Sequence, residues 1–219
     1  MPTRRPAPPQ KLTPHRFIYL ASQSPRRRQL LDQLGVRHEL LLANIEEDAE
    51  EDAESLEAVL PSEAPADYVQ RVTALKLRAA MARLRRRGLP PAPVLCADTT
   101  VAVGRRILGK PADAAEASAM LGALSGRTHR VLTAVAVHDG RRTHHALNLT
   151  RVQFAPLPAG VIQAYIASGE PFGKAGAYAM QGAIAGWIVR VQGSHSGIVG
   201  LPLFETRALL RQARVALPI

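Results

Sequence analysis

The sequence predicts an α/β fold built on a mixed, twisted sheet with flanking helices. Short apolar or β-branched runs, typical of strands, occur in mixed order with segments whose apolar residues recur at the spacing of a helix. Two of the strand-like runs are joined by Asp139-Gly140, a dipeptide typical of a tight hairpin turn. These three observations together indicate one sheet that contains both parallel and antiparallel strands.

The predicted elements follow one another from Phe17 to the C-terminus. The first strand, residues 17–21, leads into a helix in which Pro25 takes the first turn, Ser24 is the cap and Gly35 is the stop. The other predicted elements are a strand at 38–43, an acidic loop or loosely formed helix at 44–65, a helix at 66–87, a buried strand at 93–103, a helix at 113–124 capped by Asp113, strands at 130–138 and 143–154, a helix at 158–168, a Gly-rich stretch at 169–200 with a short strand near 187–191, and a helix at 201–213.

The length and composition indicate one folded domain preceded by an arm. Residues 1–16 are rich in proline and basic residues, and they lack apolar periodicity, so we predict a disordered arm. Residues 17–219 are long enough to form a single folded domain with a sizeable core, and this domain contains an acidic insert at about 46–65.

The sequence indicates a soluble, cytoplasmic protein. No stretch approaches the eighteen or so apolar residues of a membrane span, and the N-terminus lacks the apolar core of a signal peptide. The single cysteine, Cys96, excludes an internal disulfide framework and a zinc site built from cysteines.

The formal charge of +10 raises the question of a nucleic-acid partner. Residues 44–67 hold ten acids and no base, whereas residues 68–219 hold twenty bases and six acids, so the positive charge is spread over most of the chain. Aromatic residues make up only 4%, which is fewer than a protein that stacks nucleobases needs. Nucleic acid is therefore not the expected partner, whereas a small polyanion such as a nucleoside triphosphate fits the same charge.

The turn after the first strand, LASQSPRRR, is a candidate anion site. A strand that enters a helix through small hydroxyl residues brings backbone N–H groups and the positive end of the helix dipole to one place. Arg26 and Arg27 add guanidinium donors that suit phosphate oxygens. A Ser-capped helix with arginines on its surface is the alternative that the residues leave open.

Asp98 is the candidate catalytic carboxylate, because it lies inside an otherwise apolar strand where a charge is costly without a partner or a task. At the edge of a phosphate site it could hold a metal-bound water and accept its proton, and a structural pair with an arginine is the alternative. Lys76 in a helix and Lys110 in LGKP are either phosphate ligands or solvated lysines. Glu47 follows a predicted strand and could hold Mg²⁺ in an oxygen shell.

The Gly-rich stretch SGEPFGKAGAYAMQGAIAG, residues 168–186, is typical of an ordered functional loop. Its Gln181 could offer one donor and one acceptor to the edge of a base, or it could brace the loop.

Together these segments resemble the Maf family of nucleoside triphosphate pyrophosphatases. The segments that carry the resemblance are, in chain order, LASQSPRRRQLL at the first strand-helix turn, IEE at 45–47, YVQRVTALK ending at Lys76, CADTTV around Asp98, LGKP at Lys110, LSGRTHRVLTAV at 124–135, GEPFGKAGAYAMQG, and IVGLPL at 198–203. They occur in the family's order and cover roughly residues 17–215.

The resemblance implies two lobes around a central cleft, as in the inosine triphosphate pyrophosphatases, and hydrolysis of a nucleoside triphosphate between its α and β phosphates. It also implies a divalent cation, Mg²⁺ or Mn²⁺, and a homodimer. Carried over residue by residue, it makes Asp98 the proton acceptor and Glu47 a metal ligand. The residues implied for the choice of base are Arg26, Thr99 and Gln181, and those implied for phosphate binding are Ser22, Ser24, Lys76 and Lys110.

One stretch of this sequence indicates the branch of the family. KAGAYAMQG resembles the branch that acts on dTTP and UTP, and a glutamine amide can pair with the O4 and N3–H edge that thymine and uracil share. The alternatives are the branch that acts on 7-methyl-GTP and a non-enzymatic protein that binds nucleic acid or regulates division. Gly173 stands where the family often has Asp, which leaves Glu170 and Glu47 as substitutes for the missing carboxylate.

Overall fold

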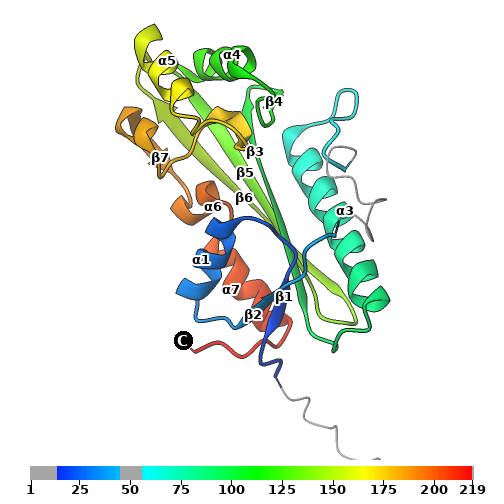
Figure 1. Cartoon of the computed structure of the whole chain (residues 1–219). Coiled ribbons are helices and arrows are strands. Elements are labelled where there is room, and N and C mark those ends of the chain that lie inside the picture. The colour runs from blue at the N-terminus through cyan, green and yellow to red at the C-terminus, as the bar shows by residue number, and fades with distance from the viewer. Residues whose placement is uncertain (1–13, 45–55, 219) are drawn as a thin grey trace, which may run out of the picture.

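The computed structural model describes residues 14–44 and 56–218, which form a seven-stranded mixed sheet with helices on both faces (Figure 1). The strand order is β2-β1-β3-β5-β6-β7, and β4 pairs with β3 outside this path. The pairs β2/β1 and β1/β3 are parallel, and all other pairs are antiparallel. The mixed α/β class predicted from the sequence is confirmed.

The strands agree closely with the sequence prediction. Their bounds are β1 (Ile18–Leu20), β2 (His38–Leu40), β3 (Val94–Val103), β4 (Arg106–Leu108), β5 (Thr128–His138), β6 (Thr143–Phe154) and β7 (Ile188–Gln192). The hairpin at Asp139-Gly140 is confirmed, since His138 pairs with Thr143 across the turn. Strand β4 is missing from the prediction because three residues are too few to show a period.

The helices also follow the predicted order. Their bounds are α1 (Pro25–Gln33), α3 (Pro65–Arg86), α4 (Ala114–Leu124), α5 (Ala159–Ala167), α6 (His195–Val199) and α7 (Leu203–Gln212), with the 3₁₀ turns η1 (Ala175–Ala177) and η2 (Ala183–Trp187). Helix α6 and the two 3₁₀ turns lie within the Gly-rich stretch at 169–200. Each has five residues or fewer, so no helical period is visible in the sequence.

Helix α1 begins as predicted, but the predicted capping bond is absent. Pro25 starts the helix and Ser24 takes the cap position, yet the Ser24 side chain makes no capping hydrogen bond. The hydroxyl oxygen of Ser22 instead accepts a bond from the Ser24 N–H, at 3.2 Å. Ser24 therefore takes the predicted cap position without a side-chain capping bond, and the first turn of α1 keeps its N–H groups for another acceptor.

The sheet has α3 on one face and α1, α6 and α7 on the other (Figure 1). Successive side chains of β3 alternate between these faces. Val94 and Cys96 pack into the core beneath α3, whereas Leu95 and Ala97 pack into the core beneath α1 and α7. By the same alternation, Asp98 faces α3 and the next residue faces the opposite layer.

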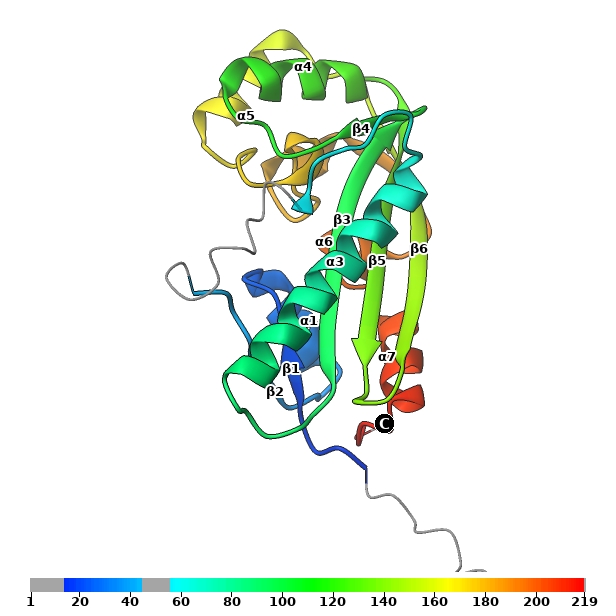
Figure 2. The same cartoon turned by 90° about the vertical axis from the view of Figure 1, so that its right-hand side faces the viewer.

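A separate apolar core lies at the far end of the long strands, where α4 and α5 cover β3, β5 and β6 (Figure 2). The loop that contains η1 is built into this core through Ala177 and Tyr178, both buried. The predicted long ordered loop is thus held against the sheet.

The edge of β3 is shared by two strands with a gap between them. Strand β1 pairs with Val94 and Leu95, and β4 pairs with Val101 to Val103. Among the described residues no strand covers 96–100 on this edge, although β5 covers the same stretch on the other edge. The gap opens the middle of a buried strand to the outside of the sheet.

The ordered contacts begin slightly before the predicted start of the domain. His15 bridges to Val215, so the chain is paired two residues before Phe17. The rest of the predicted arm, residues 1–13, and residues 45–55 of the predicted acidic insert lie outside the described residues. Within the described ranges, no helix combines the length and the apolar character that crossing a bilayer requires.

Gly176 is predicted to be a strict requirement of the η1 loop. Its φ is +71°, and a Cβ placed on it would lie 2.9 Å from three side-chain atoms of Val101. We expect Gly176→Ala to lower the free energy of unfolding by about 2–4 kcal/mol, because strained backbone and overpacking add. Denaturant unfolding of Gly176→Ala beside Gly160→Ala measures this. Gly160 lies in α5 with open space around it, so an equal loss in both variants would contradict the prediction.

Candidate active site

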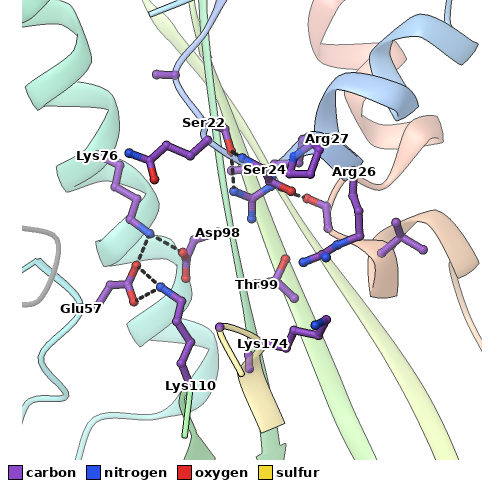
Figure 3. A pocket seen from close by; sticks show the side chains of 18 of the residues that line it. Ser22, Ser24, Arg26, Arg27, Glu57, Lys76, Asp98, Thr99, Lys110 and Lys174 are labelled. Carbon is purple, nitrogen blue, oxygen red and sulfur yellow. Dashed lines mark hydrogen bonds and ion pairs between the residues drawn. The ribbon is translucent and has the colours of Figure 1, made fainter. Parts of the chain in front are cut away.

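A pocket of about 550 Å³ lies at the gap in the edge of β3. Its walls come from the start of α1, the middle of β3, helix α3, the segment at Glu57, and the loop at 173–181. Figure 3 shows side chains from these separate parts of the chain pointing into one space. Because the gap exposes both faces of β3, neighbouring residues of the strand reach the same pocket from opposite sides.

Asp98 lies on the α3 side of this pocket and is only 8% exposed. Its Oδ1 accepts a hydrogen bond from Lys76 Nζ at 2.6 Å, and Lys76 comes from the middle of α3. A buried carboxylate needs such a partner. The partner is a lysine rather than the arginine that the structural alternative for Asp98 assumes.

Lys76 also belongs to a second group of charges. Its Nζ donates to Glu57 Oε1 at 2.7 Å, and Lys110 Nζ donates to Oε1 and Oε2 of the same carboxylate at 3.1 and 2.8 Å. Dashed lines in Figure 3 trace the chain of contacts from Asp98 through Lys76 and Glu57 to Lys110. Two ammonium groups and two carboxylates therefore meet at one end of the pocket.

The charges in this group shift one another's pKa. Burial lowers the pKa of Lys76, but the attraction of Asp98 and Glu57 outweighs it, so the net shift is upward. Burial raises the pKa of Glu57, but Lys76 and Lys110 outweigh it, so the net shift is downward. Lys76 and Glu57 are thus both stabilised in their charged forms.

The turn into α1 forms the neighbouring wall of the pocket. Arg27 Nε donates to the Gly200 carbonyl at 2.9 Å, and its Nη1 donates to Ser22 Oγ at 3.1 Å. Burial lowers the pKa of Arg27, and the nearby Asp98 opposes this shift. Arg27 therefore fastens the turn to the segment before α7, while Arg26 reaches the pocket beside Thr99 (Figure 3).

Ser22 is placed to donate rather than to accept. Its oxygen already accepts bonds from Arg27 Nη1 and from the Ser24 N–H. Ser22 lines the pocket, so its hydroxyl hydrogen is available to an anion there. Together with the N–H groups of α1 that no side chain caps, it makes this wall a set of donors.

Thr99 faces the other side of the pocket, together with Arg26 and Lys174 (Figure 3). Its Oγ1 lies 2.9 Å from Thr133 Oγ1, and Thr133 Oγ1 donates to the Gly197 carbonyl at 2.7 Å. A hydroxyl has one hydrogen. Since Thr133 gives its hydrogen to Gly197, Thr99 must be the donor to Thr133, and the Thr99 oxygen presents only lone pairs to the pocket.

Lys174 comes from the loop before η1, and its Nζ donates to the backbone carbonyl of Glu170. Burial lowers its pKa, and the positive charge of Arg26 lowers it further. The carboxylate of Glu170 accepts from the Ala183 N–H at 3.2 Å and lies against Gly182, so Glu170 braces the loop. Gly173 lines the pocket and Glu170 does not, which argues against Glu170 as a substitute for the missing carboxylate.

One of the residues that line the pocket, Tyr178, packs in a buried aromatic cluster with His129 and Phe154. Tyr178 lines the pocket, and its hydroxyl lies 2.7 Å from His129 Nε2. The rings of His129, Tyr178 and Phe154 lie within 5.4 Å of one another, centre to centre. Burial lowers the pKa of His129 to about 4 and raises that of Tyr178, so both rings stay uncharged near neutral pH.

The structure brings together nearly all of the residues that the sequence singled out. Those that line the pocket are Ser22, Ser24, Arg26, Lys76, Asp98, Thr99, Lys110 and Gln181. Glu47, the predicted metal ligand, lies outside the described residues. The alternative that Lys76 is a solvated lysine is wrong, because the carboxylates of Asp98 and Glu57 both accept hydrogen bonds from it.

Sequence reasoning missed Glu57, Lys174 and Thr133. Glu57 is one of ten acids between residues 44 and 67, and nothing in the spacing sets it apart. Thr133 belongs to an ordinary buried strand, and only its register opposite Thr99 gives it a role. Lys174 stands in the quoted loop motif, so the motif was the available signal.

The described residues contain no group of three or more His, Cys, Asp or Glu side chains that could hold a metal ion. A nucleotide enzyme does not need such a group, because Mg²⁺ is usually held by one or two carboxylates and the substrate phosphates. In the part of the chain that the structure describes, Glu57 has both oxygens bonded to lysines, whereas Asp98 has only Oδ1 bonded to one. Asp98 is thus the carboxylate that fits such a cation.

Comparison with known proteins agrees with the site. Residues 17–213 match the family described as Maf-like protein. The chain belongs to the Maf family. It is 63% identical over 201 residues to the dTTP/UTP pyrophosphatase of Cupriavidus pinatubonensis, covering 92% of this chain and 98% of the relative.

Other relatives of similar length give the same result. The dTTP/UTP pyrophosphatase of Albidiferax ferrireducens is 65% identical over 195 residues, 89% of this chain and 96% of the relative. The dTTP/UTP pyrophosphatase of Burkholderia pseudomallei is 62% identical over 202 residues, 91% of this chain and 95% of the relative. The family match over residues 17–213 includes every residue that lines the pocket, from Ala21 to Gly200.

We expect His129 to make this Maf protein sensitive to acid. Its pKa of about 4 lies below the ordinary 6.5, so between these values the unfolded chain binds a proton that the folded protein does not. Its contribution to stability is complete above pH 6.5 and is lost as the pH falls to 4, on the order of 3 kcal/mol. Unfolding free energies at pH 7 and pH 4 should differ less in His129→Phe than in the wild type; an equal difference would contradict the prediction.

Proposed function

We propose that this protein hydrolyses dTTP and UTP to the nucleoside monophosphate and pyrophosphate. The observation that carries the proposal is a buried carboxylate, Asp98, held by Lys76 in a pocket that is also lined by Lys110, Arg26 and the N–H donors at the start of α1. The names of the relatives, which match nine-tenths of this chain at 62–65% identity, support the choice of substrate.

The cationic half of the pocket binds the triphosphate. Lys76 and Lys110 provide ammonium groups for the phosphate oxygens. Arg26 lies beside Thr99, between the phosphates and the base side, and adds a guanidinium that serves both. The Ser22 hydroxyl and the free N–H groups at the start of α1 add donors, with Ser24 at the cap position. These groups stabilise the negative charge that the phosphates carry as the bond breaks.

Asp98 acts as the general base. A water attacks the α-phosphorus, its proton passes to Asp98, and the bond from the α-phosphorus to the bridging oxygen breaks, so that pyrophosphate leaves with the electron pair. Asp98 is held for this step by the rigid strand β3 and by Lys76. The nearby ammonium groups of Lys76 and Lys110 remain to neutralise the leaving pyrophosphate.

A divalent cation, Mg²⁺ or Mn²⁺, is part of the proposal. Phosphate oxygens would hold it next to Asp98, and the predicted ligand Glu47 stays a prediction. When bound, the cation neutralises phosphate charge and makes the phosphorus more open to attack.

The Thr99 side of the pocket reads the base. Thymine and uracil share an O4 acceptor and an N3–H donor, whereas cytosine carries an amino group and an unprotonated N3. The Thr99 oxygen is an acceptor because Thr133 takes its hydrogen, so it suits N3–H. The Gln181 amide, on the same pocket wall as the η1 loop, offers a donor to O4.

The two alternative functions are not favoured. The relatives reported above act on dTTP and UTP by name, not on 7-methyl-GTP. A non-enzymatic nucleic-acid protein does not explain why a carboxylate is buried among the cationic groups of a pocket. The homodimer and the cytoplasmic location that the resemblance implies stay predictions.

We expect Asp98→Asn to lower kcat for dTTP by at least about a hundredfold, because the amide cannot accept the proton of the attacking water. Pyrophosphate release measures the rate, and circular dichroism checks that the variant is folded. Asp32→Asn is the control, since Asp32 is exposed on α1 and does not line the pocket. Wild-type turnover by Asp98→Asn would remove Asp98 from the mechanism.

We expect Thr133→Val to weaken the preference for thymine and uracil over cytosine. Valine keeps the shape but releases the Thr99 hydroxyl, which could then donate as well as accept. The ratio of kcat/KM for dTTP to that for dCTP should fall about tenfold or more. Thr133→Ser, which keeps the hydroxyl, should retain the wild-type ratio; equal ratios in the wild type and Thr133→Val would refute the assignment of hydrogens.

A further inference from the structure

Glu57 contacts both of the lysines that the proposed function assigns to phosphate. Its carboxylate contacts Lys76 through Oε1 at 2.7 Å and Lys110 through Oε2 at 2.8 Å, and its side chain is 24% exposed. A carboxylate and a phosphate present the same kind of anionic oxygen to an ammonium group. The two lysines assigned to phosphate in the proposed function are therefore already bound to an anion of the chain itself.

The backbone next to Glu57 is fixed to α3. The Tyr68 hydroxyl donates to the Glu57 carbonyl at 3.0 Å, and Arg71 Nη2 donates to the Ala58 carbonyl at 2.8 Å. Arg71 also binds both oxygens of Glu63, at 2.6 and 2.8 Å. The side chain of Glu57 is thus presented to the lysines from an anchored backbone, and only its own rotation is needed to bring it to the lysines or away from them.

The charges around Lys76 and Lys110 disfavour binding of Glu57 and a triphosphate to these lysines at the same time. With Glu57 in place, the charges of Lys76 and Lys110 are matched by those of Glu57 and Asp98. A triphosphate bound to the same lysines brings several further negative charges next to the Glu57 carboxylate. Like charges in contact with the same ammonium groups repel strongly in a partly buried site. The lysines attract the phosphates fully only after the Glu57 carboxylate has left.

We propose that Glu57 is an internal competitor of the triphosphate, which occupies the two lysines in the free protein and is displaced when the substrate binds. The proposal rests on the proposed function, since it assumes that Lys76 and Lys110 bind phosphate. It makes Glu57 a residue that sets affinity and selects ligands. A chain of phosphates can replace the carboxylate on both lysines, whereas the single phosphate of the product offers less and is released more easily.

Glu57→Gln tests the proposal, because the amide has the same shape but no charge to hold the lysines. The measurement is the binding of inorganic tripolyphosphate by calorimetry. EDTA in the buffer removes metal ions, so that they cannot affect the binding. We expect Glu57→Gln to bind tripolyphosphate about tenfold more tightly than the wild type. Glu57→Asp keeps the charge on a shorter side chain that reaches the two lysines less well. Its affinity for tripolyphosphate should therefore lie between those of the wild type and Glu57→Gln.

Asp67→Asn is the matched control. Asp67 is an exposed acid in the first turn of α3, and it does not line the pocket. Its removal changes the net charge by the same amount as Glu57→Gln, so its binding should stay within about twofold of the wild type. A general effect of charge would instead tighten binding equally in both variants, and that result would overturn the proposal.

Two further outcomes separate this proposal from the proposed function. If Lys110→Met does not weaken tripolyphosphate binding, the lysines do not hold phosphate and the proposed function itself fails. If Lys110→Met weakens binding but Glu57→Gln leaves it unchanged or weaker, only the role of Glu57 fails. A higher requirement for Mg²⁺ in Glu57→Gln, with lower activity, would make Glu57 a metal ligand and also overturn the proposal.

Discussion

The structure depends on how β3 is paired. Strands β1 and β4 share one edge of β3 and leave its middle uncovered, while β5 holds the same residues on the other edge. The strand is therefore rigid and open at the same place. Because side chains alternate, Asp98 leaves the strand toward α3 and Thr99 leaves it toward α6, and the gap lets both reach one pocket. A fully paired strand would separate these two residues by the thickness of the sheet. The two ends of a nucleotide can meet adjacent residues of one strand only because of this gap.

In the protein without substrate, the positive charges of Lys76 and Lys110 are balanced by the negative charges of Asp98 and Glu57. Asp98 is buried, and a buried carboxylate without a partner would destabilise the fold, so the contact with Lys76 serves stability as well as chemistry. Lys76 in turn shares Glu57 with Lys110. An enzyme for a polyanion needs cations that stay close together while no substrate is present, and a carboxylate between them reduces their repulsion. The same carboxylate then stands in the way of the substrate. Stability of the empty site and affinity for phosphate therefore oppose each other at Glu57.

On the Thr99 side of the pocket, the direction of one hydroxyl hydrogen, that of Thr133, decides whether Thr99 can donate or only accept. Thr133 donates to Gly197, and this bond decides which way the hydrogen bond between Thr99 and Thr133 runs. The carbonyl belongs to α6, a helix too short to be visible in the sequence. Arg27 makes a related link, since it joins Ser22 to the Gly200 carbonyl at the end of the same helix. The chemical character of the pocket thus depends on a short segment about 100 residues away from β3 in the chain, and the proposed selection of the base follows from this contact.

Local patterns were enough to predict most of the elements, and the family resemblance added site residues that the structure places in the pocket. The hairpin at Asp139-Gly140, the buried strand around Asp98 and the long helix that carries Lys76 all follow from short-range periodicity and turn chemistry, which act within a few residues. What they leave open is pairing between distant segments. The order of the strands, the gap in β3, the missing cap at Ser24, the contact between Glu57 and two lysines, and the direction of the Thr99 hydroxyl each require segments that only folding brings together. Residue types and spacing supply the chemical groups, but burial and register decide which of them touch, because these depend on the packing of the whole sheet.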